Sequence, residues 1–377
     1  MVINASLAGI VAECACHNVV TGILGARHGM AGILRGQFWD LGQQNPSMIR
    51  EVGATPGSIL GSSRLSVEAA EYDRLFEVFA ARDIRYAFYN GGNGSMQTAL
   101  DVNREASRRG YALRVIGVPK TIDNDLEQTD HTPGYGSTAR FFAMAARDVG
   151  ADNWALPGTV TVLEVMGRNV GWLAAATALA RCADDDPPQL IYFPERRLDE
   201  DVMLGHVENV YRRLGRCVIA MCEGQLNEKG VPLAGADAGP PDRFGRRLSG
   251  NVGYSCAKMI GETLGVRARS EKPGVLGRST AAVVSETDRH EAWLVGVAAV
   301  RAAIQGESGV MVTLAREAGQ GYRVTTGLTP LENVAHRERR FPAEWIHPDG
   351  NDVVPGFREW VLPLTGEIEP RPRLRQL

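Results

Sequence analysis

The segment Pro119-Lys120-Thr121-Ile122-Asp123-Asn124-Asp125 holds a compact cluster of charged side chains directly after a predicted strand. Two carboxylates two residues apart, beside a lysine and a threonine, suit phosphoryl transfer. One aspartate could accept a proton from a hydroxyl nucleophile, and the other could hold or orient Mg²⁺. Lys120 could neutralise charge on the phosphate as it moves. The alternative is a capped turn, in which Asp123 and Asp125 only accept hydrogen bonds from backbone amides.

Two other segments could bind anions. Gly91-Gly92-Asn93-Gly94-Ser95 follows a predicted strand and opens a predicted helix, where backbone N–H groups and the helix dipole favour a phosphate. Many such turns carry glycine and bind nothing. In Glu164-Val165-Met166-Gly167-Arg168-Asn169-Val170-Gly171-Trp172, Arg168 sits in a glycine-flanked turn that suits bidentate contact with phosphate. Pairing of Arg168 with a surface acid would be the structural alternative.

Several isolated charges add to these segments. Glu223 follows a predicted strand and could bind sugar hydroxyls or simply face solvent. Arg64 ends the turn Gly61-Ser62-Ser63-Arg64, and Arg269 and Arg278 flank the loop 270–277. Each of these arginines alone is more often a surface charge than a ligand. Their combination with the acidic segments is what indicates a site for a phosphorylated substrate.

The elements that must position these residues alternate between strand and helix. Helices are predicted over Ala5–Cys16, Ser66–Asp83 and from about Met96, and strands over Arg85–Tyr89, Leu113–Val118, Thr159–Val165 and Cys217–Cys222. Such alternation predicts an α/β fold with a doubly wound parallel sheet, which binds ligands at its strand ends. The four polar loops after these strands could therefore converge on one crevice. We expect a long loop over 226–245 and a surface extension from Pro355.

Composition narrows the class of protein. The chain has 377 residues, a net charge of −3 and 44% apolar residues, as expected for a globular protein of two or three lobes. No apolar run approaches the ~20 residues of a membrane helix, and no basic footprint indicates nucleic acid. The N-terminus lacks the features of a signal peptide, and the six cysteines are interpreted as buried and reduced, so we expect a cytoplasmic protein. Metal binding by the Cys14-Ala-Cys16-His17 cluster is a minor alternative.

The motifs GSSR, GGNGS, PKTIDND, EVMGR and CEG occur in the order and approximate spacing found in the phosphofructokinases, and the chain resembles that family over about residues 1–330. The resemblance implies two Rossmann-like lobes with mostly parallel sheets flanked by helices. It places a phosphoryl-donor lobe in residues 1–134 with about 278–330, a sugar-phosphate lobe in 135–277, and a C-terminal extension in about 331–377. It also implies a homodimer or homotetramer.

The resemblance implies transfer of a phosphoryl group to the 1-hydroxyl of fructose 6-phosphate with Mg²⁺. Asp123 would be the general base, assisted by Lys120 and Asp125, and Asn93 and Asp125 would hold the metal. The donor phosphates would contact Arg64, Gly92, Asn93, Gly94, Ser95 and Lys120. The sugar phosphate would contact Thr121, Met166, Gly167, Arg168, Glu223 and Arg278, and Arg269 would reach the site of a neighbouring subunit.

Two residues bear on which donor is used. Lys120 matches the lysine typical of pyrophosphate-dependent members, and the stretches YNGGN and PGYGSTAR also resemble that branch. Gly94 instead matches the small residue that leaves room for the α-phosphate of a nucleotide. Pyrophosphate is the preferred interpretation and ATP the alternative. The branch also includes enzymes that accept sedoheptulose 7-phosphate.

The sequence departs from the family pattern in four places. The chain begins at Met1-Val2-Ile3-Asn4-Ala5-Ser6, without the family's first strand and glycine-rich loop, and a misassigned start is our preferred explanation. Asn93 replaces an aspartate that often assists Mg²⁺ binding, Val275 replaces a polar aromatic residue or histidine, and Thr159 replaces a basic residue. These changes leave open a third hypothesis, a catalytically weak paralogue that binds sugar phosphate and regulates a partner.

Overall fold

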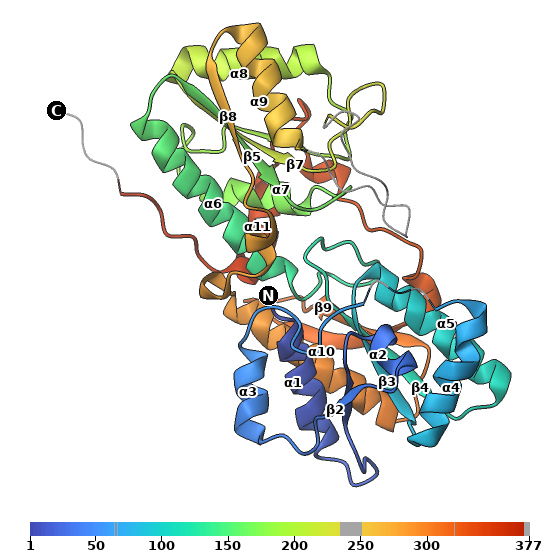
Figure 1. Ribbon diagram of the computed structural model, residues 1–377. Coiled ribbons are helices and arrows are strands. Elements are labelled where there is room, and N and C mark those ends of the chain that lie inside the picture. Colours follow the sequence, from blue (N-terminus) through green and yellow to red (C-terminus); the bar gives the residue numbers. More distant parts are fainter. Residues whose placement is uncertain (64, 66, 234–250, 320, 373–377) are drawn as a thin grey trace. The chain divides into compact units, whose positions relative to one another are not determined.

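The computed structural model describes residues 1–63, 65, 67–233, 251–319 and 321–372 (Figure 1). The chain forms two compact units. Unit 1 comprises Met1–Gly134 and Glu286–Arg339, and unit 2 comprises Tyr135–Ser285 and Arg340–Leu377. The chain therefore leaves unit 1, builds most of unit 2, returns to unit 1 and ends in unit 2.

Unit 1 is built on a four-stranded sheet with the order β10-β9-β4-β3, in which β3, β4 and β9 are parallel and β10 is antiparallel to β9. A separate antiparallel pair joins β1 and β2. The strands of unit 1 are β1 (Leu24–Ala26), β2 (Phe38–Asp40), β3 (Tyr86–Gly91), β4 (Arg114–Pro119), β9 (Val310–Arg316) and β10 (Val324–Pro330). Its helices are α1 (Ile3–Cys14), α2 (Met30–Leu34), α3 (Pro46–Gly53), α4 (Tyr72–Ala81), α5 (Asn93–Arg109) and α10 (Glu286–Ile304).

Helices cover both faces of this sheet, and its inner strand β4 is apolar on both sides. Successive side chains of a strand point to opposite faces. Ile116 and Val118 of β4 pack in one core with α1 and α10, and Val115 packs in a second core with α4 and α5. The ends of β3 and β4 are thereby fixed side by side, with Gly91 opposite Pro119. The loops that follow these two strands are neighbours for the same reason.

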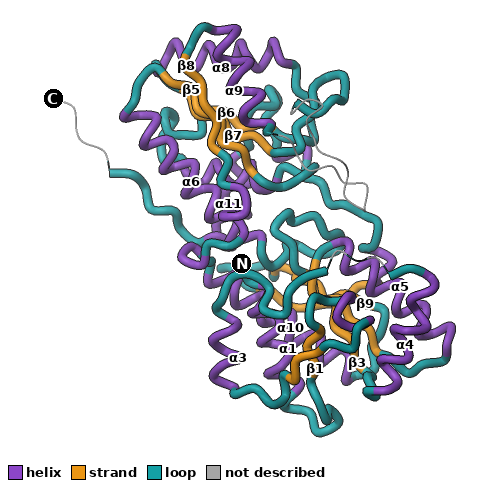
Figure 2. The backbone as a smooth tube through the Cα atoms, viewed as in Figure 1, coloured by secondary structure: helices purple, strands orange, loops and turns teal. Residues whose placement is uncertain are grey.

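Unit 2 contains an all-parallel sheet with the order β6-β7-β5-β8 (Figure 2). Its strands are β5 (Thr159–Val165), β6 (Leu190–Tyr192), β7 (Cys217–Cys222) and β8 (Arg267–Glu271). Its helices are α6 (Tyr135–Ala155), α7 (Trp172–Ala176), α8 (Glu200–Leu214), α9 (Val252–Leu264) and α11 (Pro355–Thr365). Helices α8 and α9 share a buried core with β5, β6 and β7, while α6 contacts β5 and β7 and is in turn contacted by α11.

The α/β architecture and the four strands predicted from the sequence are confirmed, but several boundaries differ. Helix α5 begins at Asn93 rather than near Met96, so Asn93, Gly94 and Ser95 lie in its first turn. The helix predicted over Ser66–Asp83 starts later: Ser66 is outside the described residues, and a reciprocal cap between Glu68 and Glu71 opens a short 3₁₀ turn ahead of α4. Of the long loop expected over 226–245, residues 234–245 lie outside the described part.

The C-terminal region differs most from expectation. The return to unit 1 runs from Glu286 to Arg339, rather than from about 278 to 330, and residues 340–372 belong to unit 2. The surface extension expected from Pro355 is wrong. Phe357, Val361 and Leu364 of α11 are buried, and Phe357 packs against the rings of Phe341, Trp345 and Trp360. Four prolines from Pro355 onward suggested an irregular chain. Pro355 lies in the first turn of α11, where proline is tolerated, and Pro363 lies inside the helix.

Cysteine burial follows the expectation only in part. Cys14, Cys217, Cys222 and Cys256 are buried, but Cys16 and Cys182 are exposed. All six are free thiols. Within the described residues, no three His, Cys, Asp or Glu side chains gather as a metal centre would require, the Cys14–His17 cluster included. The described helices include none long and apolar enough to cross a membrane.

Candidate active site

The glycine-rich loop of unit 1 lies where β3 meets the N-terminus of α5. Gly92 is the N-cap of the helix, and the amides of Ser95 and Met96 donate back to the Gly92 carbonyl. A Cβ on Gly91 would lie 2.1 Å from the Ser95 hydroxyl, so that glycine is needed for the tight turn. A Cβ on Gly94 would meet nothing within 4 Å. The first turn of α5 therefore presents backbone amides beside open space, as an anion site requires.

The acidic loop 120–125 follows β4 and is held against this turn. The Lys120 amide donates to the Gly91 carbonyl at 3.0 Å, which joins the two loops directly. Asn124 adopts a left-handed conformation with φ of 57° between the two aspartates. Its side-chain oxygen accepts the Thr132 amide at 2.9 Å, and the Asp123 amide donates to the Thr121 hydroxyl at 3.2 Å. Asp123 and Asp125 are only 9% and 8% exposed, so both carboxylates are largely shielded from water.

Asn93 and Asp125 meet across these two loops. The Asn93 amide nitrogen donates to Oδ2 of Asp125 at 2.9 Å and to its backbone carbonyl at 3.3 Å. This leaves Oδ1 of Asn93 and Oδ1 of Asp125, both buried, without a hydrogen-bond partner. Two buried acceptor oxygens on contacting side chains fit a hard cation such as Mg²⁺, which prefers oxygen ligands and takes few of them from the protein.

The second cluster lies in unit 2, at the ends of the neighbouring strands β5 and β7. The Arg168 amide donates to Oε1 of Glu223 at 3.2 Å, and the Glu223 amide donates to the Val165 carbonyl at 2.9 Å. Arg168 has a φ of 54° and Gly167 a φ of 134°, so the turn reverses sharply. The Arg168 side chain is exposed. An exposed arginine and a carboxylate at adjacent strand ends suit a ligand with both an anionic group and hydroxyls.

Met166 and Arg278 approach the same end of β5. A Cβ on Gly277 would lie 3.6 Å from the Met166 sulfur and 2.8 Å from the Phe142 ring. The short 3₁₀ turn Gly274–Arg278 therefore packs next to the Met166–Arg168 turn and carries the exposed Arg278 there. Val275 of this turn is 62% exposed.

Arg269 lies apart from the Arg168–Glu223 cluster within unit 2. It stands opposite Thr161 in the middle of the sheet, several residues before the end of β5. Its guanidinium forms an ion pair with Asp152 of α6, and its Nε lies 3.4 Å from the Thr161 hydroxyl. Thr159, two residues earlier, is buried.

The four polar loops divide between the two units. The loops after β3 and β4 belong to unit 1, and those after β5 and β7 belong to unit 2. Within each unit, the two loops contact one another. Arg64 lies outside the described residues.

Sequence reasoning missed two groups that hold these loops. Thr132 anchors the loop 120–125 through Asn124, as described above. Glu195 accepts hydrogen bonds from the amides of Gly171 and Phe341 at 2.9 and 2.8 Å, and so supports the turn that carries Arg168. Burial raises the pKa of the Glu195 carboxyl, partly offset by those amide bonds. Glu195 has no local sequence signal, because Gly171 and Phe341 are distant in the chain. Thr132 lies near Asn124 in the chain, but no motif marks their contact.

Known proteins resemble this chain over most of its length. The family model for phosphofructokinase matches residues 1–303. A pyrophosphate–fructose 6-phosphate 1-phosphotransferase from Rhodospirillum rubrum is 40% identical over 378 residues, covering 98% of this chain and 92% of the relative. A sulfofructose kinase from Alkalicoccus urumqiensis is 32% identical over 364 residues, covering 96% and 91%. The crystal structure of a pyrophosphate-dependent phosphofructokinase from Nitrosospira multiformis superposes with a TM-score of 0.88 at 34% identity, covering 100% of this chain and 91% of that one.

Proposed function

The chain belongs to the phosphofructokinase family, and we propose that it transfers a phosphoryl group from inorganic pyrophosphate to the 1-hydroxyl of fructose 6-phosphate. The products are fructose 1,6-bisphosphate and phosphate. The observation that carries the proposal is the contact between Asn93 and Asp125, which joins the glycine-rich loop to the loop of Asp123. The names of the Rhodospirillum relative and the Nitrosospira structure support this donor and acceptor.

The donor half of the chemistry belongs to unit 1. The amides at the start of α5, from Gly92 to Ser95, would bind the transferred phosphoryl group and the leaving phosphate. Lys120 would pair with the same compact, highly charged donor. Asn93 and Asp125 would hold Mg²⁺ through their unsatisfied Oδ1 atoms. When bound, Mg²⁺ would neutralise charge on the pyrophosphate oxygens.

Asp123 would act as the general base. Its carboxylate accepts the proton of the 1-hydroxyl, the hydroxyl oxygen bonds to the transferred phosphorus, and the bridging P–O bond of pyrophosphate breaks. The electron pair of that bond leaves with inorganic phosphate. The largely buried position of Asp123 favours this role, because a carboxylate shielded from bulk water interacts more strongly with the bound hydroxyl.

The acceptor half belongs mainly to unit 2. Arg168 and Arg278 would bind anionic oxygens of the sugar phosphate, Glu223 would accept hydrogen bonds from its hydroxyls, and Met166 and Gly167 would line the sugar. Thr121 of unit 1 would contact the same substrate next to Asp123. The sugar must then reach Asp123 with its 1-hydroxyl.

We also propose that the enzyme is a cytoplasmic homodimer or homotetramer, in which Arg269 serves the sugar-phosphate site of a neighbouring subunit. The position of Arg269 in the middle of β8, away from Arg168, is compatible with that role. Asp152 would then hold the guanidinium in a fixed orientation.

ATP is the second candidate donor. The open space around Gly94 favours it, because nothing within 4 Å of this position would obstruct the α-phosphate of a nucleotide. Lys120 argues for pyrophosphate instead. The two donors therefore need a direct comparison.

The test is an initial-rate assay of the purified chain with fructose 6-phosphate and Mg²⁺, supplied with pyrophosphate or with ATP. We expect fructose 1,6-bisphosphate to form with pyrophosphate. Turnover with ATP alone would overturn the choice of donor. Absence of turnover with both, while calorimetry still detects fructose 6-phosphate binding, would favour the regulatory paralogue. Sedoheptulose 7-phosphate in place of fructose 6-phosphate tests the acceptor.

A further inference from the structure

A short segment of unit 1 fixes the loop 120–125, and we name it the brace: residues 129–134. Thr132 donates through its amide to Asn124 Oδ1 at 2.9 Å and through its hydroxyl to the Thr121 carbonyl at 2.9 Å. The Thr121 amide donates to the Pro133 carbonyl at 3.2 Å. At the end of the brace, a Cβ on Gly134 would lie 3.3 Å from Cε of Lys120. The brace therefore contacts the loop 120–125 on both sides of Asp123.

The brace is in turn fastened to two other elements of unit 1. Its first residues pair with β9, where the Asp130 amide donates to the Leu314 carbonyl at 2.9 Å and the Leu314 amide donates to the Thr129 hydroxyl at 2.9 Å. Its last residue contacts α10, where the Gly134 amide donates to Oδ1 of Asp288 at 2.7 Å. Between these two attachments the brace carries His131, which is 1% exposed.

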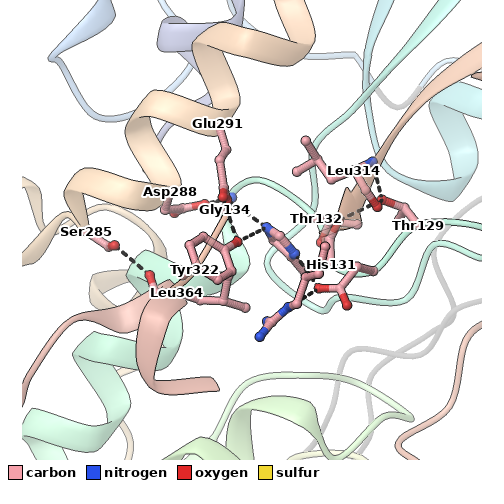
Figure 3. Close-up of polar contacts among 12 residues, drawn as sticks. Thr129, His131, Thr132, Gly134, Ser285, Asp288, Glu291, Leu314, Tyr322 and Leu364 are labelled. Carbon is pink, nitrogen blue, oxygen red and sulfur yellow. Dashed lines mark hydrogen bonds and ion pairs between the residues drawn. The ribbon is translucent and has the colours of Figure 1, made fainter. Parts of the chain in front are cut away.

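Both ring nitrogens of His131 face carboxylates. Nδ1 lies 2.7 Å from Oδ1 of Asp130, and Nε2 lies 2.7 Å from Oε2 of Glu291 on α10. Tyr322 donates its hydroxyl to the other oxygen of Glu291 at 2.6 Å, and Figure 3 shows its ring beside that of His131. An ionised carboxylate only accepts hydrogen bonds, so two such partners require two N–H groups on the ring. That requirement is met by the imidazolium and not by neutral histidine.

The charges around the ring agree with this protonation state. Asp130 and Glu291 contact it directly, and Asp288 lies one turn away on α10. Arg316 of β9 donates to Oδ1 of Asp130 at 2.8 Å, and the Arg339 guanidinium donates to the Asp130 carbonyl at 2.6 Å. Loss of the histidine proton would leave a buried neutral ring between two carboxylates, with no N–H for one of them, which is costly.

We propose that protonated His131 is a positioning residue, which fastens the brace to α10 and thereby sets the geometry of Lys120, Asp123 and Asp125 for phosphoryl transfer. The inference rests on the proposed function for its reaction, but its structural part does not. Burial lowers the pKa of His131, while the bonds to Asp130 and Glu291 outweigh burial and raise that pKa above its usual value near 6.5. The contacts of both ring nitrogens with carboxylates favour the protonated ring, and these charged contacts are lost as the pH rises through the raised pKa.

The first test needs no activity. His131→Gln keeps the approximate size of the side chain but cannot donate to both carboxylates. Hydrogen exchange of the peptide spanning residues 119–127 should become faster in this variant, because the brace loosens. His17→Gln is the matched control, since His17 in the same unit contacts a single carboxylate, Glu13, at 3.1 Å. Unchanged exchange in His131→Gln, or equal acceleration in both variants, would overturn the proposal.

Nitrogen NMR of labelled wild-type protein gives a second measurement, which holds even if His131→Gln fails to fold. Both ring nitrogens of His131 should carry protons at pH 7. A neutral ring at that pH would contradict the proposal. If the wild type shows no phosphoryl transfer at all, the proposed function fails. The exchange and NMR results still show whether protonated His131 fastens the brace to α10.

Kinetics test the link to the reaction. His131→Gln should lower kcat by roughly a hundredfold, the scale of a misplacement of about 1 Å, with a smaller change in the KM of fructose 6-phosphate. In the wild type, kcat should fall at alkaline pH. In Glu291→Gln this fall should move to lower pH, because one of the two stabilising carboxylates is gone. If kcat falls at the same alkaline pH in His131→Gln and Glu291→Gln as in the wild type, the positioning role is overturned.

Discussion

A Cβ atom on Gly224 would lie 1.7 Å from the backbone carbonyl oxygen of Arg168. No side chain can occupy that space, and the clash is with backbone, so it cannot be relieved by a rotamer change. The absence of a side chain at Gly224 is what lets the loop after β7 lie against the turn after β5. The carboxylate of Glu223 thereby reaches the Arg168 amide at 3.2 Å.

Gly224→Ala should displace the Arg168 turn and weaken sugar-phosphate binding. We expect the KM of fructose 6-phosphate to rise roughly tenfold to a hundredfold. Gly205→Ala is the matched control, because a Cβ on Gly205 of α8 meets nothing within 4 Å. That variant should keep its kinetics and unfold at the same or a slightly higher temperature, since alanine favours a helix over glycine. Wild-type KM in Gly224→Ala would exclude the Arg168 turn from substrate binding.

Asn93→Ala should weaken Mg²⁺ binding, since it removes one of the two unsatisfied oxygens next to Asp125. The Mg²⁺ concentration for half-maximal rate should rise roughly tenfold to a hundredfold. Calorimetry with Mg²⁺ and pyrophosphate gives an independent value. Gln97→Ala removes another amide of α5 that bonds a carboxylate, Asp101, at 2.8 Å, and should leave the Mg²⁺ dependence unchanged. An unaltered Mg²⁺ requirement in Asn93→Ala would rule out this metal site.

Gly94→Asp should discriminate between the two donors. The open space at Gly94 accommodates the new side chain, so the fold should be retained, and an acid in the first turn of a helix is favourable. Any turnover with ATP should be lost, because the aspartate would occupy the position of the α-phosphate and repel it. Turnover with pyrophosphate should persist. Equal losses with both donors would show that Gly94 does not control donor choice.

The buried carboxyl of Glu195 should make the free energy of unfolding depend on pH. Burial raises its pKa above 4.5, so the folded protein holds this proton more tightly than the unfolded chain. Stability should therefore fall as pH rises from about 4.5 through the raised pKa. Glu195→Gln removes that titration, and its melting temperature relative to wild type should rise by a few degrees over the same pH range. Glu228 is exposed, and Glu228→Gln is the control that should follow the wild-type melting profile. A melting temperature of Glu195→Gln that changes with pH in the same way as that of wild type would contradict this prediction.

The ligand-binding loops after β3, β4, β5 and β7 could be predicted because the residue patterns that identify them lie within short segments of the sequence. A glycine-rich turn between a strand and a helix, and polar residues directly after apolar strands, identify ligand-binding loops in an α/β protein. The start of α5 at Asn93 was missed because glycine, asparagine and serine have low intrinsic helix propensity. At a helix N-terminus the same residues are tolerated, since their amides need no partner inside the helix.

Features that depend on distant contacts could not be predicted. Phe357 becomes buried only because Phe341, Trp345 and Trp360 gather around it, and a run rich in proline gave no sign of that. His131 and Glu291 are 160 residues apart, and their contact follows from the return of α10 to unit 1.

The measurement that tests the central claim most directly compares wild type with Asp123→Ser under pyrophosphate, fructose 6-phosphate and Mg²⁺, with calorimetry of fructose 6-phosphate binding in parallel. Loss of the general base should lower kcat by roughly 10²–10⁴-fold, while fructose 6-phosphate still binds. Near-normal turnover in Asp123→Ser, or a wild-type protein that binds fructose 6-phosphate and transfers no phosphate from pyrophosphate, would contradict the account.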